Sequence, residues 1–345
     1  MKKIVLKQFG QLEIQEVPIP VPAPGQAVIR IHYAGICGSD LHVYDGQHPT
    51  AKVPLVMGHE GAGTLVAIND SRTDVKVGDK VCAHTVNPCH ACPACTSGRE
   101  NLCSHVKIMG TNFDGVYTQY MLVDADRVIC FNDNVDDRLA TLAEPLTVAV
   151  HDVRRSGLVA GDTVLISGAG PIGLAIAILA RFYGASKIVM LEVDPSRIAL
   201  AESFGFTVLN AREPACRDTC RMLSHGQGYD RTFEVSAQPS SFATCIEETK
   251  PGGVMVQVGM PPAGASFDLN INKVIFGECD IRGVRHHTMN DMQKAVELIN
   301  AGHMNDQLLK LASVVYPLEE TEQALERTRR DKSVLRVLLD FDTGE

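Results

Sequence analysis

Residues 162–173, DTVLISGAGPIG, decide the fold of the second half of this chain. An apolar run ends in glycines, and the pattern of a helix, PIGLAIAILARFYG, begins at Pro171. The hexamer that joins them is G-x-G-x-x-G, and its setting between a strand and a helix predicts a dinucleotide-binding βαβ unit. We expect Gly168 to allow the tight turn, Gly170 to admit a pyrophosphate at the helix N-terminus, and Gly173 to let helix and strand pack closely. Pro171 and Ile172 complete the predicted cofactor loop.

Strands and helices alternate on the C-terminal side of this loop. Further strands are predicted over 187–193, 229–236 and 252–260. The helix over 194–205 has Asp194 as its predicted N-cap and Pro195 as its first residue, because these residue types favour those positions. Such alternation predicts an α/β domain, a doubly wound parallel sheet with helices on both faces.

Glu192 ends the strand that follows the glycine loop, at the distance expected for the acid that binds the adenosine ribose. Its carboxylate would repel a 2′-phosphate, so we expect NAD rather than NADP. The positive charge of Arg197 would oppose this preference by attracting a 2′-phosphate, unless its position on the helix only places it beside the ribose. Asp194 is an alternative ribose ligand, although its capping role is favoured.

The N-terminal part, residues 1 to about 150, shows short β-type runs separated by Gly and Pro, and it predicts an irregular β-rich domain. After about residue 285 the sequence predicts two amphipathic helices and a final strand over 333–341.

Four cysteines stand within NPCHACPACTSGRENLC, residues 87–103, with the spacing C-x2-C-x2-C-x7-C. Short spacers of this kind let one loop supply four thiolates to a tetrahedral zinc. A site closed by four thiolates has no open position, so we expect a structural zinc at Cys89, Cys92, Cys95 and Cys103 that supports stability rather than chemistry.

The composition excludes several classes of function. The chain has 345 residues, which predicts about two domains, and its hydrophobic content of 45% suffices for sizeable cores. The net charge of -9 and the absence of a basic run argue against nucleic acid or a membrane surface as a partner. No export signal and no membrane-spanning stretch are recognisable, and 11 cysteines suit a reducing compartment, so a cytoplasmic location is expected.

A second metal site is suggested by GICGSDLH at 35–42, by GHE at 58–60 and by LAEPL at 142–146. These segments offer one thiolate, one imidazole and carboxylates, and three protein ligands with an open fourth position are typical of catalytic zinc. Spacing alone does not unite them. However, these motifs, the four cysteines and GAGPIG follow one another as in the zinc-dependent medium-chain dehydrogenase/reductase family. The chain resembles the polyol (sorbitol) dehydrogenase branch over essentially its full length.

The resemblance implies a GroES-like catalytic domain at 1–148 with its zinc lobe at 87–105, a Rossmann NAD-binding domain at 149–284, and a segment at 285–345 that returns to the catalytic domain. It implies two zinc ions and NAD as cofactors, and a homodimer or homotetramer as the assembly.

The resemblance also assigns roles within the site. Cys37 and His59 would hold the catalytic zinc, and Glu144 would bind it directly or through water. Glu60 can enter the zinc shell in relatives, so the choice between the two glutamates stays open. Asp40 would hold the His59 ring, and Arg336 would reach the pyrophosphate. Ser39 would take the proton of the alcohol and His42 would pass it to solvent.

The expected activity is hydride transfer between NAD and a secondary alcohol of a polyol, sugar acid or similar polyhydroxy compound. Vicinal diols such as butanediol and the hydroxyl of L-threonine are alternatives. A zinc-binding interaction protein is the alternative outside enzymes, and zinc-free quinone reductases are disfavoured by Cys37, His59 and the cysteine lobe. A third metal site at Cys216, Cys220 and His225 is not expected, and His286 and His287 are expected to be solvated.

Overall fold

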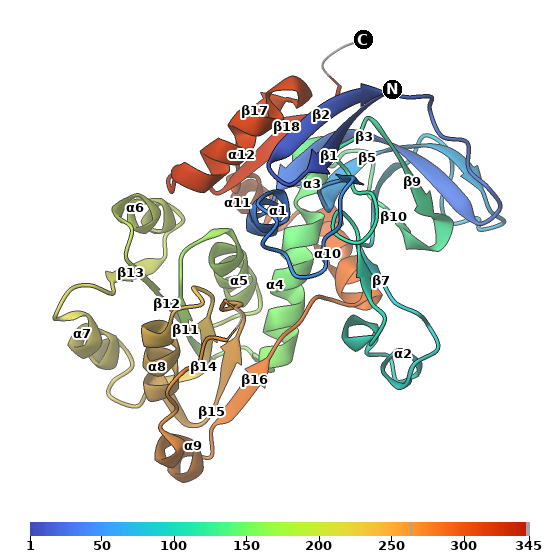
Figure 1. Ribbon diagram of the computed structural model, residues 1–345. Helices are drawn as coiled ribbons and strands as arrows, with labels where there is room; N and C mark the ends of the chain where they lie inside the picture. Colours follow the sequence, from blue (N-terminus) through green and yellow to red (C-terminus); the bar gives the residue numbers. More distant parts are fainter. Residues whose placement is uncertain (263, 343–345) are drawn as a thin grey trace. The chain divides into compact units, whose positions relative to one another are not determined.

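The computed structural model describes residues 1–262 and 264–342 of the chain. It consists of two compact units, each with its own sheet (Figure 1). One unit is Val148–Arg285, and the other combines Met1–Thr147 with the chain from His286 onward.

The unit Val148–Arg285 is built on a parallel sheet. In the described residues it has six strands in the order β13-β12-β11-β14-β15-β16. This is the 3-2-1-4-5-6 order of a doubly wound nucleotide-binding sheet, so the predicted architecture is confirmed. The strands are β11 (Thr163–Ser167), β12 (Lys187–Glu192), β13 (Thr207–Asn210), β14 (Tyr229–Glu234), β15 (Thr249–Gln257) and β16 (Asp280–Gly283).

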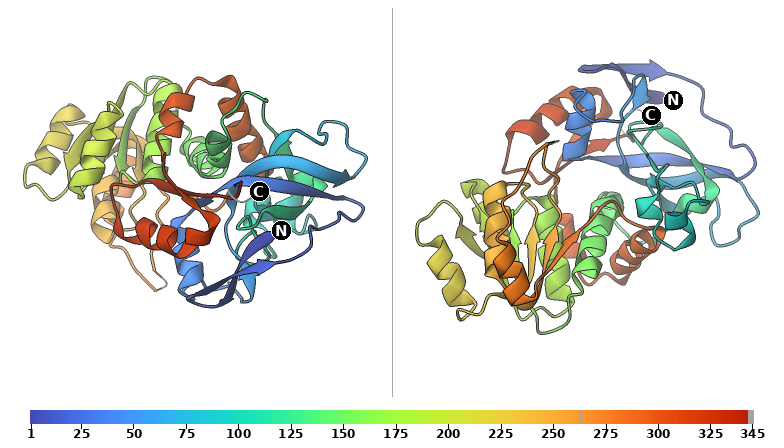
Figure 2. Two further views of the ribbon diagram at one scale, coloured as in Figure 1. Left: turned by 90° about the horizontal axis from the view of Figure 1, so that it is seen from above. Right: turned by 60° about the horizontal axis from the view of Figure 1, so that its bottom comes forward.

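Helices cover both faces of this sheet (Figure 2). They are α5 (Pro171–Phe182), α6 (Pro195–Ser203), α7 (Cys216–Leu223), α8 (Pro239–Glu248) and α9 (Ile271–Gly277). The predicted cap of α6 is present, because the Asp194 side chain accepts hydrogen bonds from the backbone of Ser196 and Arg197.

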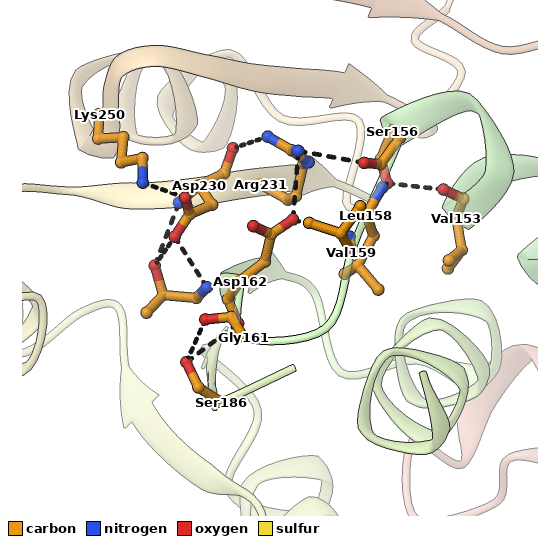
Figure 3. Close-up of polar contacts among 12 residues, drawn as sticks. Val153, Ser156, Leu158, Val159, Gly161, Asp162, Ser186, Asp230, Arg231 and Lys250 are labelled. Atoms are coloured by element: carbon orange, nitrogen blue, oxygen red, sulfur yellow. Dashed lines mark hydrogen bonds and ion pairs between the residues drawn. The ribbon is translucent and has the colours of Figure 1, made fainter. Parts of the chain in front are cut away.

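Charged groups tie the strands of this sheet together beside the turn that precedes β11 (Figure 3). Asp162 lies 3.2 Å from the Arg231 guanidinium of β14. Asp230 accepts hydrogen bonds from the backbone and hydroxyl of Thr163, at 2.9 and 2.7 Å, and pairs with Lys250 of β15. The cluster lies at the amino ends of β11 and β14, away from the glycine loop that follows β11.

The other unit contains a mostly antiparallel sheet of seven strands in the described chain, with β10-β6-β5-β3-β18-β17 in order and β9 also paired to β3. These strands are β3 (Gln26–Ile36), β5 (Glu60–Asn69), β6 (Lys80–Ala83), β9 (Tyr120–Asp124), β10 (Val128–Cys130), β17 (Ala312–Pro317) and β18 (Arg336–Asp340). Because β18 pairs with β3, with Val337 opposite Ile36, the C-terminal strand brings Arg336 beside the end of β3.

Shorter elements surround this sheet. The small strands are β1 (Lys2–Gln8), β2 (Gln11–Glu16), β4 (Leu55–Val56), β7 (Val86–Asn87) and β8 (Lys107–Ile108). The helices are α1 (Gly38–Tyr44), α2 (Pro93–Thr96), α3 (Asp137–Thr141), α4 (Ala143–Ser156), which continues into the other unit, α10 (Met289–Ala301), α11 (Asn305–Leu309) and α12 (Thr321–Arg330). Short 3-10 helices lie at η1 (Glu100–Leu102), η2 (Ala125–Arg127) and η3 (Leu318–Glu320).

The core of this unit joins residues from both ends of the chain. Side chains of β1, β3 and β5 pack with Leu318, Leu325, Val337 and Leu339 in one apolar cluster. Across the described residues, no helix is long and apolar enough to cross a membrane.

Candidate metal and cofactor sites

Three of the predicted metal ligands converge in the β-rich unit. The ligand atoms of Cys37, His59 and Glu60 all lie within 4.8 Å of one another. The strand register explains this, because Gly35 at the end of β3 lies opposite Glu60 at the start of β5. A glycine suits this position, since a Cβ at position 35 would lie 2.3 Å from Oε2 of Glu60 and would displace that carboxylate.

The carboxylate of Asp40 contacts two of these residues, Cys37 and His59. Its Oδ2 accepts a hydrogen bond from the backbone of Cys37 at 2.8 Å, and its Oδ1 lies 3.4 Å from Nδ1 of His59. The phenol of Tyr117, a fully buried residue that sequence reasoning missed, donates to the same carboxylate at 3.0 Å. Although burial opposes a charged ring, Asp40 raises the pKa of His59 well above its usual value.

The surroundings of Cys37 favour the ionised form of its thiol. Burial alone would raise the pKa of its thiol, but the hydrogen bond and charge of His59 lower the pKa to about 6. A thiolate is the form of cysteine that binds zinc.

Glu60 is a buried carboxylate with a buried partner. Its Oε2 lies 3.1 Å from Nε of Arg336, whose Nη1 donates to the carbonyl oxygen of Ile36 at 3.0 Å. Burial raises the pKa of Glu60 well above its usual value. Within the described residues no hydrogen bond reaches its buried Oε1. A thiolate, an imidazole and a carboxylate with an unused oxygen fit zinc. The role of Arg336 at a pyrophosphate stays a prediction, since in this structure its guanidinium contacts Glu60.

Glu144 lies outside that three-residue group and is held by a histidine. Its Oε1 is 3.1 Å from Nε2 of His287. Burial raises the pKa of the Glu144 carboxyl, but His287 and the charge of His59 lower it overall. The expectation of a solvated His287 is wrong, because its side chain is only 2% exposed. A single histidine after a strand carries no sequence signal for such a contact.

Ser39 and His42 lie on α1, three residues apart and therefore on the same side of this short helix. Ser39 is partly buried and His42 is exposed. Nδ1 of His42 lies 3.1 Å from Oε1 of Gln47. Their part in proton transfer stays a prediction.

The four cysteines of the lobe form the second group in the described chain that could hold a metal. The sulfurs of Cys92 and Cys95 lie 3.5 Å apart, and those of Cys89 and Cys95 lie 4.0 Å apart. Sulfurs at the corners of a zinc tetrahedron would be separated by about 3.8 Å. Backbone N–H groups lower the pKa of Cys92 to about 5. The thiols are free and not in disulfides, so the lobe fits a closed four-thiolate zinc.

The glycine loop of the other unit has the expected form. Gly168 adopts φ +111, and a Cβ at Gly173 would lie 2.0 Å from the carbonyl oxygen of Gly168, which shows how closely α5 packs on the turn. At Gly170 the nearest neighbour of such a Cβ is the Arg197 guanidinium, at 3.8 Å.

Glu192 is buried beneath the loop and is engaged by the backbone. Its Oε2 accepts from the N–H of Ala169 at 2.8 Å, and its Oε1 accepts from Val193 and Asp194 at 2.7 and 3.1 Å. The carboxylate therefore orders the turn itself. Its contact with a ribose stays a prediction.

Two known protein families match this chain in successive segments. Residues 23–133 match the family described as alcohol dehydrogenase GroES-like domain, and residues 171–301 match the family described as zinc-binding dehydrogenase. The chain is 31% identical to sorbitol dehydrogenase of Bacillus subtilis (strain 168) over 96% of this chain and 95% of the relative. It is 34% identical to L-threonine 3-dehydrogenase of Chelativorans sp. (strain BNC1), over 82% and 83%.

Solved structures agree with these relatives. L-idonate 5-dehydrogenase from Escherichia coli str. K-12 substr. MG1655 superposes with a TM-score of 0.88 at 31% identity, covering 98% of this chain and 97% of the other. The chain belongs to the zinc-type medium-chain alcohol dehydrogenase family, and within it resembles the polyol dehydrogenases. It is a dehydrogenase that acts on CH–OH groups, and the expected GroES-like and Rossmann domains are confirmed.

Proposed function

We propose that this protein oxidises a secondary alcohol of a polyol, sugar acid or related polyhydroxy compound, with two zinc ions and NAD as its cofactors. The observation that carries the proposal is the convergence of Cys37, His59 and Glu60, whose ligand atoms lie within 4.8 Å of one another, with Glu144 near enough for the charge of His59 to lower its pKa. Relatives named sorbitol dehydrogenase and probable D-xylulose reductase A support a polyhydroxy substrate.

In this proposal Cys37, His59 and one of the two glutamates hold the reactive zinc. When bound, zinc supplies a Lewis acid that lowers the pKa of an alcohol oxygen, and NAD supplies the acceptor for the hydride. Asp40 keeps the His59 ring oriented through Nδ1. The proton of the alcohol would pass to the hydroxyl of Ser39 and onward to the exposed ring of His42, which would release it to solvent.

NAD binding is assigned to the glycine loop, from Gly168 to Gly173, and to Glu192. Because Glu192 is an acid next to the expected ribose, NAD is preferred over NADP. Arg197 beside Gly170 could tolerate a phosphate. Relatives of known structure carry NADH, as in the protein rspB from Escherichia coli, and NADP, as in a dehydrogenase from Sinorhizobium meliloti.

We also propose that the chain forms a homodimer or homotetramer in the cytoplasm. Large apolar side chains gather at α9 and are exposed to solvent: Leu269 at 40%, Ile271 at 55%, Ile275 at 61% and Phe276 at 85%. Clusters of this kind on a protein surface often mark a contact with another protein chain. The free cysteines suit a reducing compartment.

The substrate class is tested with polyols, aldonates, butanediol isomers and L-threonine, each followed by NADH absorbance. Polyols or aldonates are expected to give the highest kcat/KM. L-Threonine and butanediol are the alternatives named by relatives and neighbours, and a clear preference for either would redirect the proposal.

The metal assignment is tested with Cys37→Ser. We expect the loss of one zinc per chain and of nearly all activity, because a serine hydroxyl is a poor substitute for a thiolate. The control is Cys216→Ser, a partly buried thiol of the other unit. Full activity and two retained zinc ions in Cys37→Ser would refute the assignment.

A further inference from the structure

Glu144, His287 and His84 form a series of buried side chains in the β-rich unit, each in polar contact with the next. Nε2 of His287 lies 3.1 Å from Oε1 of Glu144, and Nδ1 of His287 lies 3.2 Å from Nε2 of His84. The side chains of His84 and His287 are each only 2% exposed. Their rings meet edge-on, with centroids 5.1 Å apart. Both nitrogens of the His287 ring therefore have polar partners, as buried polar groups usually do.

With Glu144 ionised and His287 neutral, the donors and acceptors of this series follow one order. An ionised Glu144 accepts and cannot donate, so Nε2 of His287 carries its proton. The hydroxyl of Thr85, at 3.5 Å, is too distant to compete for that proton. In a neutral ring, Nδ1 of His287 is then an acceptor, and Nε2 of His84 must donate to it. Burial lowers the pKa of His84 to about 2, which agrees with a neutral ring there.

The segments that carry the two histidines are held by hydrogen bonds of the backbone. His287 precedes α10, where Thr288 and Asp291 form a capping box. The N–H of Met289 donates to Oε1 of Glu100, within the cysteine lobe, at 2.9 Å. The segment that carries His287 is therefore anchored to the lobe.

His84 is held at the end of β6. Its backbone N–H donates to the carbonyl oxygen of Arg127 at 3.0 Å, and the buried Arg127 guanidinium donates to the carbonyl oxygen of Val86 at 3.1 Å. These contacts fix the backbone that carries the His84 ring.

We infer that His287 is the positioning residue of Glu144: it donates to Oε1, holds the carboxylate oriented for the reactive metal, and is itself held by His84. This inference rests on the proposed function, because it needs a zinc at Cys37 and His59. Groups that hydrogen-bond to a ligand carboxylate typically contribute 10- to 100-fold to metal affinity.

The test compares His287→Phe with His287→Gln in the full-length, zinc-loaded protein. Phenylalanine keeps a planar ring but removes the donor, whereas the glutamine amide can still donate to Glu144. Zinc per chain is measured against increasing concentrations of a chelator, and the visible spectrum is recorded with cobalt in place of the reactive zinc. The matched control is His303→Gln, an exposed histidine after α10. The lobe zinc serves as an internal reference.

We expect His287→Phe to bind the reactive zinc about 10- to 100-fold more weakly, with an altered cobalt spectrum. His287→Gln should recover much of the loss, and the control should match the parent protein. Unchanged affinity and spectrum in His287→Phe would overturn the inference. If His287→Phe does not fold, His84→Phe is measured in its place. A zinc affinity and a cobalt spectrum equal to those of the parent protein in His84→Phe would also overturn the inference.

Failure of the inference is distinguishable from failure of the proposed function. If the parent protein holds only the lobe zinc, the proposed function fails. If the parent holds two zinc ions and the histidine variants hold both as tightly, only the role of His287 is refuted.

Discussion

Asp40 shows how one buried residue serves several others. Its carboxylate accepts from the backbone of Cys37 and from Tyr117 and lies beside His59. The sequence could suggest Asp40, because it stands in GICGSDLH beside a predicted ligand. It could not suggest Tyr117, His84 or His287, since a single tyrosine or histidine far along the chain has no spacing that marks its partner.

Glu60 and Arg336 form a buried ion pair, and breaking it should lower the free energy of unfolding. The two side chains are 1% and 4% exposed. Arg336→Leu should destabilise the protein by about 3 kcal/mol, because it leaves a buried carboxylate without its countercharge. The effect should lie at the lower end of the usual range, since burial already raises the pKa of Glu60 and favours its protonated form.

Guanidinium unfolding measures this cost. The double variant Glu60→Gln/Arg336→Leu should recover part of the lost stability, because no unpaired charge remains. A single variant Arg336→Leu as stable as the parent protein would show that the pair contributes little.

Helix ends were predictable at the scale of the element. Asp194 caps α6, and Gly205 follows that helix with φ +78. Both depend on local chemistry, a side chain that accepts from nearby N–H groups and a residue without a Cβ. The strands of the β-rich unit were predicted less sharply, because their partners lie far away in the sequence and their bulges follow from that pairing.

The contacts that join β11 to β14 give an element-scale prediction (Figure 3). Arg231 pairs with Asp162, side chains 15% and 10% exposed, and also donates to the carbonyl oxygen of Gly157 at 3.1 Å. Arg231→Met should cost about 3 kcal/mol of unfolding free energy, because Asp162 stays behind in a poorly solvated position.

The matched control is Arg282→Met in the same unit. Its pair with Asp280 is more exposed, at 34% and 60%, and such pairs contribute at most about 1 kcal/mol. Chemical unfolding of both variants makes the comparison. Equal losses would show that burial of the Asp162 pair has no special effect.

At the scale of the whole molecule, we expect the exposed apolar side chains of α9 to contact another copy of the chain. Phe276→Lys should weaken self-association roughly 30- to 150-fold, since burying a phenylalanine contributes about 2–3 kcal/mol. Mass measured by light scattering over a dilution series tests this.

The control is Met222→Lys, a similarly exposed residue on α7. It should leave the mass unchanged. If the parent protein is a monomer at all concentrations, or Phe276→Lys associates as strongly as the parent, α9 is not part of an interface.

The sequence by itself determined the glycine loop, the alternation of strands and helices that follows it, and the cysteine lobe, because each depends on residues close together in the chain. Only the tertiary structure decided the surroundings of the reactive group. The pairing of β3 with β5 and β18 brings Cys37, Glu60 and Arg336 together. The segment before α10 brings His287 to Glu144, 143 residues away in the sequence. Such contacts arise from strand pairing and core packing over long separations, which short-range patterns do not encode.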